Sequence, residues 1–282
     1  IVPGRFGSDR CREVADRPDD PSLFRRCRGN LYLDSLSALV WTLKRNRMWS
    51  AFLSLASMTM LILQALLGMW AQAHRLLPIT VAGHLLLGFA MLVLLYLLYL
   101  VSAADVPETP SVETGTRVMA WLGLLLVVSQ TAAGGWASAN HAGLACPEFP
   151  GCLGQAWPDA DFHGGFSPWR MLRAESAESV LSWRSRAAIH WVHRLGGLAT
   201  YLLLTLLSIL LSLHRSSAKL RRLGVGLAVM ALAQAGFGAA LVLMRMPVLL
   251  GTVHSLMTGA LLVLMVYLCH LITPGRQRLE RV

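Results

Sequence analysis

The feature that most constrains this chain is a series of six apolar runs, each about 20 residues long and nearly free of charge. A helix needs roughly 20 apolar residues to cross a hydrocarbon core about 30 Å thick. Lipid cannot pair backbone N–H and C=O groups, so only helices and closed barrels cross it. The alternating strands of a barrel are missing from the sequence. The pattern predicts an all-α polytopic membrane helical bundle with spans at 49–71, 79–101, 118–137, 187–212, 223–244 and 247–270.

The charged residues support this class and orient the spans. They make up 14% of the chain, against about 25% in a soluble domain. Eleven Lys and Arg lie in one set of connections and six in the other. By the positive-inside rule, the segment before residue 49 and the C-terminus are cytoplasmic, while the loop 138–186 is outside. The net charge of +10 therefore reflects topology and requires no nucleic-acid partner.

Two cysteines lie in the predicted outer loop, on the oxidising side of the membrane. Cys146 and Cys152 are close enough along the chain to close a small disulfide ring. Two unpaired thiols are the alternative, and zinc is disfavoured because no second Cys pair follows. The remaining cysteines fall on the cytoplasmic side and are expected to be reduced: Cys11, Cys27 and Cys269.

An internal repeat at an offset of 170 positions relates the two halves of the chain. Four residues of the first half, Gln64, Gly68, Arg75 and His84, recur as Gln234, Gly238, Arg245 and His254. Such a repeat predicts a duplicated four-plus-four helix architecture. The expected domains are an atypical basic segment (1–48), the remainder of an N-terminal half (49–101) and a C-terminal four-helix half (118–272).

The internal repeat also extends into the basic segment 1–48. The same offset lays 207–215 over 37–45, so the segment is expected to contain the remnant of a helix end. The chain is then expected to lack the first one and a half helices of the duplicated plan. A truncated or frame-shifted gene and a genuine short variant are the two explanations.

Three histidines lie at matched depth near the outer ends of separate spans: His84, His193 and His254. Ionisable residues inside spans are costly, so they indicate function. Each is followed four positions later by a small residue, which lets a helix or a flat macrocycle approach: Gly88, Gly197 and Thr258. Imidazole binds haem iron, and two facing helices can supply both axial ligands. The alternative is a histidine hydrogen-bonded between helices.

Four segments of the chain resemble the motifs of a known family. The run Gly134 to Pro158 (GGWASANHAGLACPEFPGCLGQAWP) looks like the loop signature of haem A synthases, membrane enzymes of cytochrome oxidase assembly. The segments IHWVHRLG (189–196), VAGH (81–84) and TVH (252–254) are similar to its histidine motifs. The resemblance covers about 49–272, most of the chain.

The resemblance implies a function and its cofactor. Members have two related four-helix halves in the bacterial plasma (inner) membrane. The C-terminal half holds haem b, here between His193 and His254. The N-terminal half receives haem O and oxidises its C8 methyl group to a formyl, which yields haem A. Haem O synthase and an electron acceptor are the partners implied.

The chain departs from the family in its first half. The family has an outer Cys pair and a Glu-x-x-His-Arg motif there, and neither is present. His84 is then the candidate ligand for the substrate haem, and no catalytic residue can be named. A chain with this sequence alone is expected to bind haem b without completing the reaction.

Two further residues are candidates for accessory roles. His190, one turn before His193, is either a partner of the site or a packing residue. Arg194, with Arg75 or Arg245, is expected to pair with haem propionates. Snorkelling to the membrane interface is the alternative for the two loop arginines.

Two other functions remain open. A b-type cytochrome that only passes electrons explains the histidine pair but not the loop that carries Cys146 and Cys152. A secondary transporter built from repeats would favour broken helices and charged residues at the midplane. The histidines of this chain instead cluster near one membrane face.

Overall fold

The computed structural model describes residues 48–73, 77–102, 110–167 and 181–273. Within these ranges, six long helices and one short one are present: α3 (Met48–Ala73), α4 (Pro78–Ser102), α5 (Thr114–Ala139), α6 (Phe162–Gly165), α8 (Trp183–Ser212), α9 (Ala218–Leu243) and α10 (Val248–Ile272). The six long helices are each long and apolar enough to span a membrane. The predicted all-α polytopic bundle is confirmed. The predicted helix remnant at 37–45 and both chain termini lie outside the described residues.

The helices extend beyond the predicted spans at their polar ends. α8 begins at Trp183 because the side chain of Ser182 caps it, accepting a hydrogen bond from the Ser185 N–H. α9 begins at Ala218, where the side chain of Ser217 caps it in the same way. Counting apolar residues misses these first turns, because a helix can continue past the lipid where polar groups cap it.

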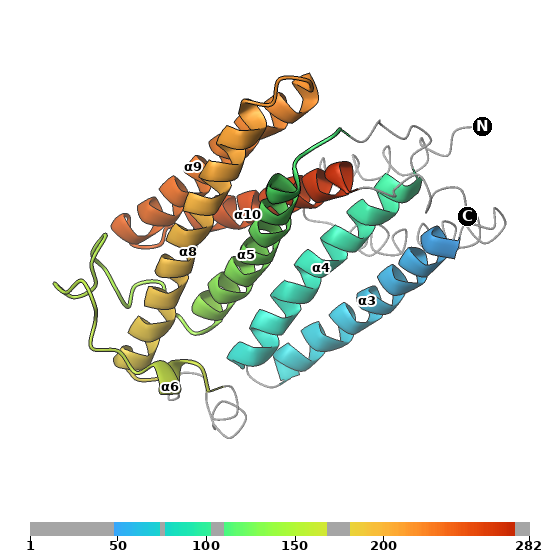
Figure 1. The fold of residues 1–282 in the computed structure, drawn as a ribbon. Helices are drawn as coiled ribbons and strands as arrows, with labels where there is room; N and C mark the ends of the chain where they lie inside the picture. Colours follow the sequence, from blue (N-terminus) through green and yellow to red (C-terminus); the bar gives the residue numbers. More distant parts are fainter. Residues whose placement is uncertain (1–47, 74–76, 103–109, 168–180, 274–282) are drawn as a thin grey trace.

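Four of the long helices pack in a ring, so that they form two pairs of opposite helices. α5 packs on α8, α8 on α9, α9 on α10, and α10 returns to α5. Consequently α8 and α10 form one diagonal of this four-helix unit, and α5 and α9 form the other. α3 and α4 lie side by side next to it, and α4 contacts both α5 and α10 (Figure 1).

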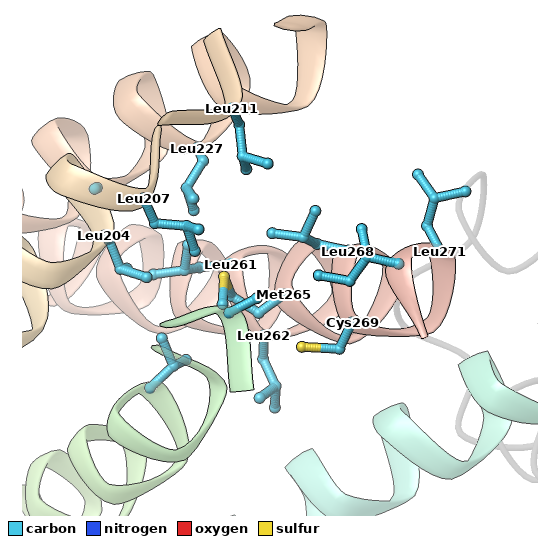
Figure 2. Packing of buried hydrophobic residues seen from close by; sticks show 14 of the residues in the cluster. Leu204, Leu207, Leu211, Leu227, Leu261, Leu262, Met265, Leu268, Cys269 and Leu271 are labelled. Carbon is cyan, nitrogen blue, oxygen red and sulfur yellow. The ribbon is translucent and has the colours of Figure 1, made fainter. Parts of the chain in front are cut away.

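Buried apolar side chains fill one half of the four-helix unit. Leu204 and Leu207 of α8, Leu227 of α9 and Met265 and Leu268 of α10 interdigitate there (Figure 2). All of them lie toward the helix ends remote from the 140–161 loop, which we call the disulfide loop. His193 and His254 lie in the other half, so the packed half holds their helices in place.

Large apolar side chains also cover the outside of the helices. More than half of the side-chain surface of several residues on α8 and α9 is exposed, for example Leu202, Val225, Val229 and Leu232. Contiguous exposed apolar surface of this kind marks contact with lipid or another protein. Together with the six spanning helices, it fits an integral membrane protein.

Candidate functional site

His254 is held by two residues of the preceding helix. The amide nitrogen of Gln234 on α9 lies 3.3 Å from His254 Nε2, 3.3 Å from the His254 carbonyl oxygen and 2.6 Å from Thr258 Oγ1. Gly238, one turn after Gln234, faces the imidazole, since a Cβ there would lie 3.3 Å from His254 Cε1. The glutamine therefore fixes the height of the histidine, and the glycine leaves room for its ring.

The first half repeats this arrangement around His84. The amide nitrogen of Gln64 on α3 lies 3.0 Å from the His84 carbonyl oxygen and 3.4 Å from His84 Nε2. A Cβ at Gly68 would lie 3.0 Å from His84 Cε1. The repeat predicted from the sequence thus extends to the side-chain contacts.

A related arrangement, which was not predicted from the sequence, surrounds His193. A Cβ at Gly134 on α5 would lie 3.1 Å from His193 Cε1. Gln130 precedes Gly134 by one turn, giving the same Gln-x-x-x-Gly spacing, and its amide lies directly over Gly196 of α8. The Gln-x-x-x-Gly spacing is present in the sequence. A long loop separates α5 from α8, however, so the spacing alone did not indicate that His193 is the histidine beside it. Gly196 accordingly accommodates Gln130 and does not leave open space.

His193 and His254 come from the diagonal helices α8 and α10. The Nδ1 atoms of both rings are buried without a hydrogen-bond partner among the described residues. The same part of the chain contains no cluster of three or more His, Cys, Asp or Glu side chains that would hold a metal ion. Two imidazoles supply only an axial pair, so iron between them requires a macrocycle for its remaining ligands. These residues fit haem.

His190 points to the disulfide loop. Its Nδ1 lies 2.9 Å from the Ala142 carbonyl oxygen, and its Nε2 lies 3.1 Å from Nε of Arg194. A carbonyl oxygen can only accept, so Nδ1 carries the proton and Nε2 accepts from the guanidinium. Both ring nitrogens are thus used within the protein, which places His190 in the attachment of the loop.

Arg194 completes this attachment. Its guanidinium donates to the carbonyl oxygens of Cys146 and Gly151, both at 2.6 Å, and to that of Pro150 at 3.4 Å. It also lies 5.6 Å from the ring centroid of Phe149. The Arg194 donors are therefore mostly directed at the loop. Propionate binding by Arg194 and by Arg245, exposed in the α9–α10 turn, stays a prediction, and Arg75 lies outside the described residues.

The disulfide loop is closed by the predicted bond. Cys146 and Cys152 are joined with an S–S distance of 2.01 Å, and both are fully buried against Ala187 and Trp191 of α8. Cys269, in contrast, is a buried free thiol in α10. The disulfide and the reduced state predicted for Cys269 are confirmed.

None of the six long helices contains an Asp or Glu residue. The described helices therefore supply no carboxylate that would act as a general acid or base.

A separate groove of about 730 Å³ runs along α10 beside α4. Its lining is apolar or small and includes Phe89, Gly251, Ser255 and Gly259. No histidine lines it, so it is distinct from the three histidine sites.

Comparison with known proteins agrees with this geometry. Residues 28–266 match the model of the family described as Cytochrome oxidase assembly protein. This chain belongs to that family. The match includes all three histidines with their glutamine and glycine partners. It also extends upstream of the described residues, to position 28.

A protein named Heme A synthase, from Shewanella oneidensis, is 34% identical to this chain over 208 residues. The aligned region covers 73% of this chain and 61% of the relative. The chain therefore spans less than two thirds of the length of this relative. The predicted membership of the haem A synthase family is confirmed.

Proposed function

We propose that this protein is a haem A synthase-like membrane oxidoreductase with a haem b centre between His193 and His254. The observation that carries the proposal is the placement of these histidines on diagonal helices, with a glycine facing each ring. Family membership supports haem A biosynthesis as the process.

The roles proposed for the residues follow from their chemistry. When bound, haem b would supply electron transfer, while the protein supplies ligands, burial and orientation. His193 and His254 would hold the iron, and Gly134 and Gly238 would set the position of their rings. His84 is the proposed ligand of the substrate haem O.

The proposed reaction converts the C8 methyl group of haem O to a formyl. This conversion removes electrons and protons and adds one oxygen atom, so it requires an electron acceptor. An acceptor and a haem O synthase that delivers the substrate are the proposed partners. The proposed location is the bacterial inner membrane, with both termini cytoplasmic and the disulfide loop outside.

Absorption spectra of purified variants test the haem centre. The wild-type protein should show the reduced spectrum of low-spin haem b. The variants His193→Ala and His254→Ala should each lose it or become high-spin, whereas His84→Ala should largely retain it. His214→Ala is a matched control, because His214 contacts the Ser111 carbonyl oxygen at the opposite end of the bundle. An unchanged low-spin spectrum in either of the first two variants would refute the assignment.

One observation favours a second candidate, a b-type cytochrome. The six helices contain no carboxylate, and electron transfer alone does not require one. Haem extracted from the purified protein distinguishes the two. Haem O, a hydroxylated intermediate or haem A alongside haem b would support the synthase, and haem b alone would support the cytochrome.

A further inference from the structure

The three histidines have similar surroundings, but the donors and acceptors around His84 and His254 differ in number. Thr258 lies one turn after His254, and the residue at the same position after His84 is Gly88. The 170-residue offset relates these two positions directly. The first half therefore lacks the hydroxyl group that the second half has.

This difference changes where the glutamine amide can donate. Gln234 Nε2 carries two N–H groups and has three acceptors: Thr258 Oγ1 at 2.6 Å, and His254 Nε2 and the His254 carbonyl oxygen at 3.3 Å each. Because the amide nitrogen contacts a carbonyl oxygen, it must be a donor, so His254 Nε2 accepts. Thr258 Oγ1 donates its own proton to the His254 carbonyl oxygen at 2.9 Å, which leaves its lone pairs for Gln234.

Gln64 has no such alternative. Within the described ranges, its amide nitrogen contacts only two acceptors, the His84 carbonyl oxygen at 3.0 Å and His84 Nε2 at 3.4 Å. Its two N–H groups are therefore both assigned to His84. At Gly88 the amide lies over the backbone, since a Cβ there would be 3.4 Å from Gln64 Nε2.

A histidine that binds iron through Nε2 uses the same lone pair that accepts the glutamine N–H. Iron and amide thus compete for this atom. Where the amide has another acceptor, giving up the histidine Nε2 would cost it little. Where it has none, displacement leaves a buried N–H unpaired, which costs about 1–3 kcal/mol.

We propose that Thr258 is a positioning residue that gives the Gln234 amide an acceptor other than His254 Nε2, so that the haem b of the second half is retained. Gly88 leaves the Gln64 amide on His84, which makes that histidine a weaker and more exchangeable ligand. This residue difference between the halves thereby helps to separate a resident cofactor from a haem that must enter and leave. This inference rests on the proposed haem b centre at His193 and His254.

The test measures the rate at which haem leaves the purified, haem-loaded protein in detergent, with apomyoglobin as the scavenger. Thr258→Val keeps the shape of the side chain and removes the acceptor, so release should be roughly tenfold faster, as expected for one hydrogen bond to a competing donor. Thr258→Ser keeps the hydroxyl and should release haem at the wild-type rate. Gln234→Leu removes the competing donor and gives the release rate against which the double variant is compared.

The double variant separates this role from simple packing. When Gln234→Leu is already present, Thr258→Val should have no further effect, because no amide remains that needs Thr258 as an acceptor. Thr200→Val is the matched control: the Thr200 hydroxyl also bonds the carbonyl oxygen four residues earlier, at 2.8 Å, and is not a Gln234 partner. It should leave the release rate unchanged.

Two results would overturn the inference alone. One is release from Thr258→Val at the wild-type rate, and the other is an equal acceleration with and without Gln234→Leu. A wild-type protein that contains no haem b would overturn the proposed function and this inference with it. The absorption spectrum recorded before release distinguishes these cases.

Discussion

The ring of Phe89 on α4 packs against the backbone of Gly259 on α10, and these two residues occupy the same position of the internal repeat. A Cβ at Gly259 would lie 3.4 Å from Phe89 Cε1, and the two positions differ by the 170-residue offset. Equivalent positions of two related units meet in this way near a two-fold axis. An approximate two-fold axis between α4 and α10 therefore relates the parts of the chain that carry His84 and His254.

This close contact predicts that Gly259→Leu weakens the packing of α4 on α10. A larger side chain would push Phe89 away, and overpacking of this kind costs about 1–3 kcal/mol. Thermal unfolding in detergent should show a lower midpoint than for the wild type. Gly236→Leu on α9 is the control, because a Cβ there meets no atom within 4 Å. Equal destabilisation by both variants would contradict the packing argument.

Alanine substitutions at two adjacent glycines of α8 are predicted to have different effects on stability. Gly196→Ala would force the Gln130 amide out of its position, whereas a Cβ at Gly197 would lie 3.8 Å from Gln130 Oε1, an ordinary contact. We expect Gly196→Ala to lower the free energy of unfolding by about 1–3 kcal/mol and to reduce the haem content. Gly197→Ala should behave like the wild type. Similar effects of the two would show that Gln130 does not depend on Gly196.

Arg194→Lys is predicted to loosen the disulfide loop. A planar guanidinium can reach several carbonyl oxygens and His190 together, and a lysine ammonium cannot reproduce that geometry. A water-soluble phosphine should therefore reduce the Cys146–Cys152 bond faster in this variant. Arg221→Lys is the control, since the Arg221 guanidinium donates to the carbonyl oxygens of His214 and Arg215, at the end of the bundle remote from the disulfide loop. No difference in reduction rate would contradict the role given to Arg194.

The oxidation state of the cysteines can be measured directly. Mass spectrometry after alkylation without a reductant should find Cys146 and Cys152 unlabelled, because they form a disulfide. Cys269 is a free thiol that is 1% exposed, so it should be labelled only after denaturation. Labelling of both loop cysteines in freshly isolated membranes would contradict the structure.

The orientation predicted from the basic residues can be tested with a phosphatase that is active only outside the membrane. A fusion at Val282 should be inactive, and one near Asp159 should be active, because the positive-inside rule places the C-terminus in the cytoplasm. The reverse pattern would overturn this orientation and, with it, the argument for an oxidising environment around the loop.

The sequence alone determined the six spans and the repeat, and it predicted the disulfide. Lipid leaves helices as the only solution for apolar runs of this length, and local rules of this kind depend on neighbours along the chain. The sequence also identified His84, His193 and His254 at one depth, because residue numbers along a spanning helix measure depth directly.

Only the tertiary structure decided which residues meet across helices. The packing order that places α8 and α10 on one diagonal cannot be read from the chain, because any order of apolar helices satisfies the lipid equally well. The same packing turns His190 and Arg194 toward the disulfide loop and brings Gln130 and Gly134 to the helix of His193. These contacts join residues separated by a long loop. They form because buried polar groups must find partners in space, wherever those partners lie in the sequence.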